Sequence, residues 1–477
     1  MKQAPPWQLV PVVAALFFVA PAAAQQGTQQ SAQQSAQQNA QAESSPASAV
    51  SDGADADFAA WLAAPQRCER LPPSLGERPL ALEMALRAVV CRSGSVRQGS
   101  GLAMQAQAAL DRALGQRQPA LNLSTGFDRS RGAGSAFNAE LRVDWVLYDF
   151  GVADASTRQA RHALLAVMDE QRGEVLAAVA QGAQLFAAAQ AALGRLDAAA
   201  QNLGTAQENA RAAVARYGAG AATLSDKLQA ETAVAQNKLE HARVSSQWLA
   251  ARGTLALAMG LAAAWPLVLP PADTAQPALP AAPHLEQLLD EARANHPRII
   301  AARSRWSEAQ SRASSIDAER WGSVSAGARA GRSRASSADV VSATSSVGVE
   351  WSLPLWFDRG VLRGRMKDAL GQVQVRAVGI EEAERQVASQ VWQEGQALIA
   401  EIDGLRASRE VLDTAEAALR VASERFRQGA GGFRDVLAAQ SNAANARFQW
   451  VESRANLARA QWRLAAAVGR FGTALTP

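Results

Sequence analysis

Residues that could carry out catalysis or bind a metal are few in this chain of 477 residues. Four histidines and two cysteines are too few for a zinc or iron–sulfur centre with several protein ligands. None of the histidines has metal-ligand spacing or a nucleophile-elbow motif beside it; they are His162, His241, His284 and His296. We therefore expect histidines on solvated faces, no cofactor, no metal and no enzyme activity.

Two glycine-rich segments, Gly218–Thr223 and Arg427–Gly432, are each followed by acidic residues. A glycine loop that binds nucleotide phosphates follows a strand and carries a dinucleotide fingerprint or a Lys-Ser/Thr pair. These segments instead connect two predicted helices, so the glycines serve a tight reversal of the chain. The next helix begins near Ser225 and Asp226 in the first case and near Asp435 in the second, where a helix N-terminus favours a carboxylate.

The helices around these segments occur twice in the sequence. Apolar and small residues spaced alternately by three and four run from Leu196 to Tyr217 and recur from Leu405 to Phe426, at a constant offset of 209 residues. The same offset relates further pairs, which are Arg216/Arg425, Gly220/Gly429, Asp226/Asp435 and Gly260/Gly469. A register kept over so long a segment indicates an internal duplication. The spacing and the many alanines are typical of close coiled-coil packing.

Each repeat is predicted to have the order helix, strand, strand, helix, helix. Repeat 1 occupies residues 79–265 and repeat 2 residues 284–472, and the Pro/Ala-rich linker 266–283 between them would break a continuous helix. We expect first helices at Leu80–Arg117 and Leu285–Arg320, and long helices at Val152–Tyr217, Leu224–Gly260, Val361–Phe426 and Phe433–Gly469. The longest would extend about 100 Å at 1.5 Å per residue.

Four segments alternate apolar and polar residues with the period of a β-strand, at about 119–127, 137–147, 323–331 and 344–353. Each has about the nine to eleven residues with which a tilted strand crosses a bilayer. Aromatic residues gather where the strands end, as in an interfacial belt; they are Trp145, Tyr148, Phe150, Trp351, Trp356 and Phe357. A soluble sandwich is the alternative, but together with the export-signal pattern of residues 1–24 the strand pattern favours a membrane barrel with a polar lumen.

Four strands are too few to close around a pore, since membrane barrels need at least eight. An open sheet in hydrocarbon would leave unpaired backbone groups at its edges. The sequence therefore predicts that several copies share one barrel.

The first 24 residues have the pattern of a cleaved export signal, with the apolar stretch Leu9–Ala20 and the small residues Ala22–Ala24. An uncleaved membrane anchor is the alternative. Residues 25–78 form a low-complexity Gln/Ser/Ala leader that ends in a Pro-rich segment. No later segment has eighteen uninterrupted apolar residues, so we expect no transmembrane helix.

The formal net charge of +4, with 19% charged residues, is too small to indicate nucleic-acid binding. Cys68 and Cys91 would lie in an oxidising compartment, where a disulfide between the leader and the first helix is favoured. Two buried, unpaired thiols are the alternative.

Taken together, these features resemble the TolC-type outer-membrane factors, over about Pro79–Gly472. The resemblance is carried by the duplicated unit, by WVLYDFG and LPLWFDRG at the strand exits, and by RYGAGAATLSD and RFRQGAGGFRD at the helical turns. It implies an α+β membrane protein in which a trimer forms one twelve-stranded outer-membrane barrel and a periplasmic coiled-coil tunnel. It also implies docking on an inner-membrane ABC transporter and an adaptor protein. The cysteines that flank PPSLGERPLALEMAL resemble those of the subgroup serving type I protein secretion.

In that family the helical turns form the periplasmic entrance, which Asp, Tyr and Arg side chains close. The matching positions here are Ser225, Asp226, Phe426, Gly431 and Asp435. Three departures stand out, because Phe426 occupies a gating Tyr position, Gly431 an Arg position and Ala438 that of a second Asp. We therefore expect the closed entrance to be held differently, with Arg434 taking part. Asp226 and Asp435 then either form carboxylate rings that face cations or only cap their helices.

The resemblance implies a passive export duct in the outer membrane that reaches into the periplasm. Its cargo would be a protein, a toxin of the haemolysin/cyclolysin type, and its partners the inner-membrane transporter, the adaptor and outer-membrane lipid. One alternative is the outer-membrane component of a drug or small-molecule efflux pump. The other is a periplasmic coiled-coil adaptor or structural protein, which would need no detergent.

Overall fold

The computed structural model describes residues 79–130, 134–270, 282–335, 340–353 and 359–470. All of them belong to the compact unit Phe58–Pro477. The predicted signal peptide 1–24, the leader 25–78, Cys68, Trp356 and Phe357 lie outside the described residues. The disulfide between Cys68 and Cys91 therefore stays a prediction.

The described elements repeat one order twice. In the first repeat they are α3 (Leu82–Arg92), α4 (Gly94–Gly115), β1 (Ala120–Ser130), β2 (Gly134–Tyr148), α5 (Val152–Gly218) and α6 (Leu224–Ala258). In the second they are α7 (Leu285–Asn295), α8 (Pro297–Glu319), β3 (Ser323–Ala335), β4 (Val340–Ser352), α9 (Arg359–Arg427) and α10 (Phe433–Val468). α5 has 67 residues and α9 has 69, which corresponds to about 100 Å each.

The first helix of each repeat is broken, which differs from the single helices expected at Leu80–Arg117 and Leu285–Arg320. His296 has φ −67° and ψ 126° between α7 and α8. The ring of Pro297 explains this, because a proline disfavours helical backbone at the residue before it. At the same place in repeat 1, Ser93 has φ −55° and ψ 127°, and the following Gly94 is a poor helix former.

The four strands form one antiparallel sheet in the order β1-β2-β3-β4. They are longer than the predicted segments, mainly towards the β1–β2 and β3–β4 turns. There the sequence is rich in Ser, Gly, Ala and Arg, so the apolar alternation that marks a strand fades although the backbone pairing continues. β1 and β4 each keep one unpaired edge within the chain.

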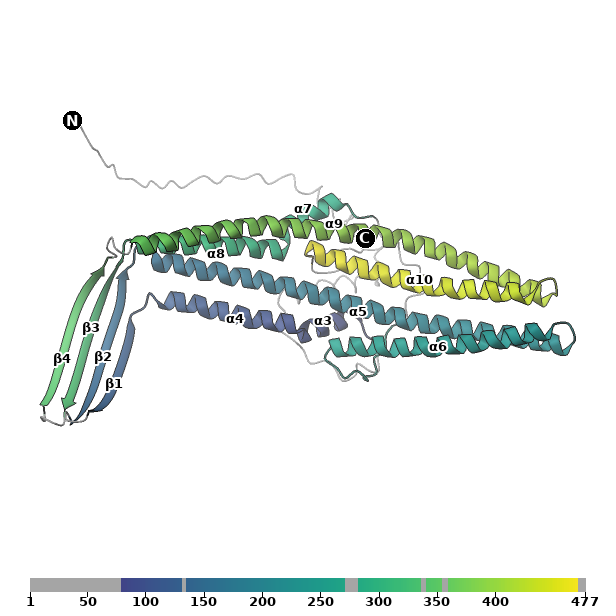
Figure 1. The fold of residues 1–477 in the computed structure, drawn as a ribbon, viewed down its shortest axis with the longest axis horizontal. Coiled ribbons are helices and arrows are strands. Elements are labelled where there is room, and N and C mark those ends of the chain that lie inside the picture. The colour runs from purple at the N-terminus through teal and green to yellow at the C-terminus, as the bar shows by residue number, and fades with distance from the viewer. Residues whose placement is uncertain (1–78, 131–133, 271–281, 336–339, 354–358, 471–477) are drawn as a thin grey trace, which may run out of the picture. The chain divides into compact units, whose positions relative to one another are not determined.

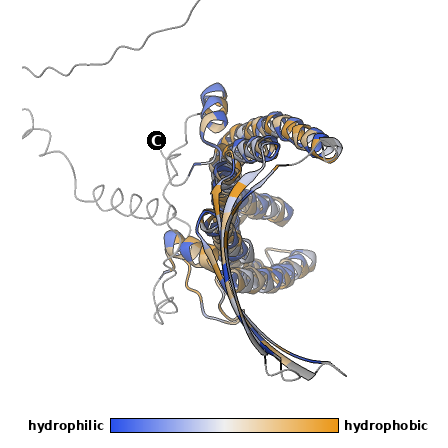
Figure 2. Ribbon diagram, turned by 90° about the vertical axis from the view of Figure 1, so that its left-hand side faces the viewer, coloured by the Kyte–Doolittle hydropathy of each residue, from blue (hydrophilic) through white to orange (hydrophobic). Residues whose placement is uncertain are grey.

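The sheet, which is curved (Figure 2), has one apolar and one polar face. The pairings Leu123–Leu141, Val143–Ala328 and Ala326–Val349 place apolar residues together. The polar face carries paired residues such as Asn122–Arg142 and Glu140–Gly331. Large apolar side chains are exposed on the first face, including Leu121, Leu123, Phe127, Val347, Val349 and Trp351. The described residues of one chain therefore leave this face without protein cover.

The long helices α5 and α9 run lengthwise through the helical part (Figure 1). α8 and α10 each contact both of them and occupy successive stretches along them, whereas α4 and α6 pack along the other side of α5. Alanines are buried along α5, among them Ala183, Ala189, Ala199 and Ala213. Their small side chains let the helix backbones approach closely, as in other tightly packed coiled coils.

The two largest apolar clusters fix the short helices α3 and α7. Leu288 and Ala292 of α7 pack with Val387 and Val391 of α9 and with Leu464 of α10. In the first repeat, Ala85 and Val89 of α3 pack in the same manner against Phe186 of α5, Leu255 of α6 and Met259, which follows α6. The duplicated sequence thus builds the same junction twice.

One described helix, α5, is long and apolar enough in composition to cross a membrane, although no such helix was expected. In its most apolar window 61% is buried against the rest of the protein. This is how a core helix packs, and it agrees with the alanine seam of α5.

Candidate functional site

The turns between the long helices are the first part of the candidate site. Gly220 and Gly429 both have positive φ, +72° and +79°, in the left-handed region that glycine tolerates. The N–H of Ala221 donates to the carbonyl of Arg216 at 2.8 Å, and that of Ala430 to the carbonyl of Arg425 at 2.9 Å. The two turns are therefore built alike, as the 209-residue offset predicts.

The beginning of α6 is closed by a capping box of Thr223 and Asp226. The N–H of Asp226 donates to Thr223 Oγ1 at 3.2 Å, and the N–H of Thr223 donates to Asp226 Oδ2 at 3.0 Å. The carboxylate accepts hydrogen bonds from the N–H of Thr223 and from its hydroxyl, the latter at 2.8 Å, and with the cations Arg434 and Arg216 nearby these bonds hold the pKa of Asp226 below its usual value. Asp226 thus caps its helix while its side chain is only half-buried, so the two expected roles are compatible.

The second turn is capped differently. Gly432 stands at the N-cap of α10, and no side chain makes a capping hydrogen bond there. Asp435 lies exposed in the first turn of α10. Its carboxylate makes no capping hydrogen bond to Gly432, whereas that of its counterpart Asp226 belongs to the capping box of α6.

Arg216, at the end of α5, connects the two turns. Its guanidinium lies over the ring of Phe426, 4.6 Å from the centroid. Its Nη1 donates to the backbone carbonyl of Phe426, and its Nη2 donates to that of Ala221 at 3.3 Å. One side chain therefore binds its own turn and the turn of the other repeat. We call this set of contacts the Arg216 clamp.

Phe426 is only 5% exposed and packs on Phe433 with ring centroids 5.2 Å apart. Ala213, Ala230 and Val436 complete this cluster. The aromatic side chain thus contributes apolar packing between the two repeats. It cannot make the hydroxyl hydrogen bond that a tyrosine at the matching position of the TolC-type family would make.

The other predicted entrance residues lie around the same two turns. Ser225 Oγ accepts a hydrogen bond from Gln229 Nε2 at 3.2 Å. Gly431 is closely fitted, since a Cβ there would lie 3.2 Å from Arg425 Cβ. Arg434 is exposed and close enough to Asp226 to lower the pKa of its carboxyl group.

Sequence reasoning missed the roles of Arg216 and Thr223. Arg216 was visible as one member of the duplicated pair Arg216/Arg425, but nothing in the pair shows which arginine bridges the turns. Thr223 followed by Asp226 three residues later is a capping-box spacing, and this signal could have found it.

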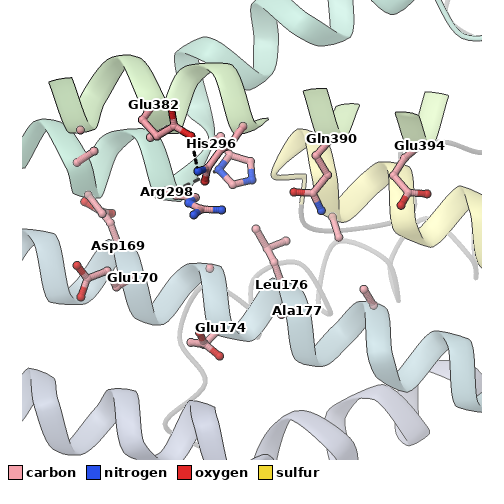
Figure 3. A pocket seen from close by; sticks show the side chains of 18 of the residues that line it. Asp169, Glu170, Glu174, Leu176, Ala177, His296, Arg298, Glu382, Gln390 and Glu394 are labelled. Atoms are coloured by element: carbon pink, nitrogen blue, oxygen red, sulfur yellow. Dashed lines mark hydrogen bonds between the residues drawn. The ribbon is translucent and has the colours of Figure 1, made fainter. Parts of the chain in front are cut away.

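A cavity of about 870 Å³ lies where α5, α8, α9 and α10 meet (Figure 3). Arg305 donates to both oxygens of Glu170 at 3.1 Å. Burial raises the pKa of the Asp169 carboxyl group, although Arg172 donates to it at 2.8 Å. Ion pairs at the junction of these helices, such as Arg305 with Glu170, therefore contribute to the lining of the cavity.

His296 differs from the solvated histidine that we expected. It is half-buried at the same cavity, and burial, with Arg298 nearby, lowers its pKa. Its Nδ1 accepts a hydrogen bond from the N–H of Arg298 at 3.2 Å, so it caps α8. Within the part of the chain that the structure describes, no three His, Cys, Asp or Glu side chains are grouped to hold a metal ion.

Aromatic residues lie where the strands join the helices. Tyr148 and Phe150 make an edge-to-face contact at 4.8 Å, and Phe150 lies 6.4 Å from the ring of Trp321. Trp145 Nε1 donates to the carbonyl of Arg117 at 3.1 Å, and Trp351 is exposed. Trp321 was not among the predicted belt residues, because the prediction considered aromatic residues where strands end, and Trp321 lies just before the start of β3.

Comparison with known proteins agrees with this architecture. The model of the family described as "Outer membrane efflux protein" matches residues 91–261 and 288–470, so both repeats are included. Protein CyaE of Bordetella pertussis is 28% identical over 423 residues, which cover 84% of this chain and 86% of that protein. The predicted resemblance to the TolC-type family is confirmed.

Solved structures share the fold. The CmeC outer membrane channel of Campylobacter jejuni has a TM-score of 0.70 at 14% identity and covers 85% of this chain and 93% of its own. The outer membrane protein VceC of Vibrio cholerae has a TM-score of 0.67 at 18% identity, covering 82% and 96%. The predicted α+β fold class is therefore confirmed. The chain belongs to the outer membrane efflux protein family, whose members are channels of the outer membrane and not enzymes.

Proposed function

We propose that three copies of the chain share one twelve-stranded barrel, with the helices continuing as a tunnel through the periplasm. The four-stranded sheet has two unpaired edges and an uncovered apolar face. In the hydrocarbon core of a bilayer, the unpaired backbone groups at the edges of an open sheet would be costly. If several copies close one barrel together, every strand edge is paired. Eight strands leave little room inside, and a larger barrel leaves a water-filled lumen. The export signal 1–24 delivers the chain to this compartment.

We propose further that the duct serves type I secretion of a protein, of the haemolysin/cyclolysin toxin class, together with an inner-membrane ABC transporter and an adaptor. The observation that carries this proposal is the similarity to Protein CyaE along nearly the whole chain. The segment between Cys68 and Cys91, which resembles the secretion subgroup, supports it. The family description, "Outer membrane efflux protein", favours a second candidate, which is small-molecule efflux.

A secretion assay in complemented cells tests this proposal. Cells that lack their own outer-membrane factor would carry a type I transporter, its adaptor and a haemolysin-type cargo, with or without this chain. We expect the chain to raise the amount of cargo in the medium about tenfold or more over cells that lack it. Restored drug resistance without secreted cargo would favour the efflux pump. A soluble periplasmic chain would favour the adaptor.

We propose that the helical turns form the entrance of the duct, with Ser225, Asp226, Gly431, Arg434 and Asp435 around it and Phe426 packed beneath them. Asp226 is half-buried and Asp435 is exposed, and both lie in the first turn of the helix that follows their turn, so a trimer would present these carboxylates as rings. Such rings concentrate cations at a pore mouth.

The double variant Asp226→Asn with Asp435→Asn is expected to shift the reversal potential of planar-bilayer currents towards zero under a salt gradient. Asparagine removes both charges and keeps an oxygen for the capping box, so the change reports on charge. Asp413→Asn is the control, because that carboxylate pairs with Arg409 at 3.0 Å and lies well inside α9. Unchanged cation preference in the double variant would mean that these carboxylates do not line the entrance.

A further inference from the structure

Charged residues of the sheet separate by face. On the polar face arginines pair with acids, as Arg142 does with Asp144 at 2.6 Å and Arg329 with Glu140 at 3.9 Å. On the apolar face of the described strands the register places only arginines among the charged residues; they are Arg129, Arg332 and Arg334. No acid shares that face within the described residues, so its charge is all positive.

All three arginines lie at one end of the sheet. Arg129 stands opposite Ser135, next to the β1–β2 turn. Arg332 stands opposite Ala139 and Ala343, near the β3–β4 turn. β1 begins just after α4 and β3 just after α8, so these turns are the end of the sheet farthest from the helices. In an outer-membrane barrel with a periplasmic tunnel, that end reaches the outer leaflet.

The position of these arginines determines what they can contact. An arginine on the lipid face costs about 2–4 kcal/mol at the bilayer midplane but about 0–1 near the interface. Its long side chain can place the guanidinium at the headgroups while its stem stays in apolar surroundings. A guanidinium binds a phosphate through two parallel, charge-assisted hydrogen bonds. Phe127 and Phe137 lie on the same face in the row between Arg129 and Arg332, so apolar rings that could contact acyl chains lie beside the cations.

We propose that Arg129 and Arg332 form a binding site for a phosphorylated glycolipid of the outer leaflet, a lipid of the lipid A type with two phosphates. β1 and β3 are separated by two strand spacings, about 10 Å, and Arg332 aligns with Thr125, four residues or about 13 Å along the strand from Arg129. The two backbone positions are therefore about 16 Å apart, so the two long cationic side chains suit two phosphates on one headgroup better than one phosphate. Arg334 lies on the same face in β3 and extends the site. The inference rests on the proposed barrel and adds a lipid partner to it.

The test uses purified, detergent-extracted trimers of the full chain. Their affinity for lipid A with two phosphates is measured by native mass spectrometry, beside dephosphorylated lipid A, phosphatidylglycerol and inorganic phosphate. The double variant Arg129→Gln with Arg332→Gln is expected to bind lipid A about tenfold more weakly or worse. The control variant Arg142→Gln with Arg329→Gln removes the same charge from the polar face and should bind it as the unchanged protein does.

Three results would overturn the proposal. They are undiminished binding of lipid A by the Arg129/Arg332 variant, equal binding of dephosphorylated lipid A, and equal binding of phosphatidylglycerol or of phosphate alone. Trimers that form normally and show any of these results overturn only this inference. A chain that stays monomeric and soluble without detergent would overturn the proposed barrel as well, so the two failures are distinguishable.

Discussion

Val347→Arg is expected to lower the yield of outer-membrane trimers about tenfold or more. Val347 lies in the middle of β4, opposite Ala328, and is 86% exposed in the single chain. If the apolar face contacts lipid, an arginine near the midplane costs about 2–4 kcal/mol in each copy, and three copies add their penalties. Heat-modifiable trimers in outer-membrane fractions, quantified by gel electrophoresis, measure this effect.

Gly348→Arg is the matched control. Gly348 is the next residue of β4 and faces the opposite side, across from Gly327. A side chain added there meets open space, so the same charge would project into the polar lumen. We expect a trimer yield within about twofold of the unchanged protein, as for most surface substitutions. Equal losses in both variants would contradict the proposed orientation of the two faces.

Arg216→Met is expected to separate the two helical turns and to raise the frequency of open-channel events about tenfold. The variant loses the Arg216 clamp, which consists of the contact with the Phe426 ring and the hydrogen bonds to the carbonyls of Phe426 and Ala221. A hydrogen bond from a charged donor contributes about 1.5–3 kcal/mol, and a cation–π contact about 0.5–2 kcal/mol. Methionine keeps much of the apolar stem, so packing changes little. Single-channel recording of trimers in planar bilayers measures the result.

Arg425→Met provides the comparison within the same molecule. Arg425 is the duplicated counterpart of Arg216 and is exposed, so its loss should leave the opening frequency unchanged. Trimer yield, measured for both variants, separates an effect on opening from an effect on assembly. If both variants form trimers and conduct as the unchanged protein does, the Arg216 clamp does not hold the entrance closed.

Local sequence signals predicted the elements well where one pattern governs each segment. The long helices end within one or two residues of the expected positions, because glycines stop them both at the turns and at Gly260 and Gly469. The breaks at Ser93 and His296 were missed, although Pro297 was visible, because the apolar pattern continues across both. The strands were predicted too short for the related reason that their turn-proximal ends lack apolar alternation.

What the sequence by itself determined is the duplication, the α+β order of each repeat and the two-faced strands, since these depend on spacing along the chain. Only the tertiary structure decided which residues meet at the turns. Arg216 binds the carbonyl of a residue 210 positions away, and Arg434 lies beside Asp226 of the other repeat. The repeats present near-identical turns, so pattern alone cannot say which arginine bridges them. The packing of α5 with α10 and of α10 with α9 brings Phe426 under Arg216, while Arg425 remains in solvent.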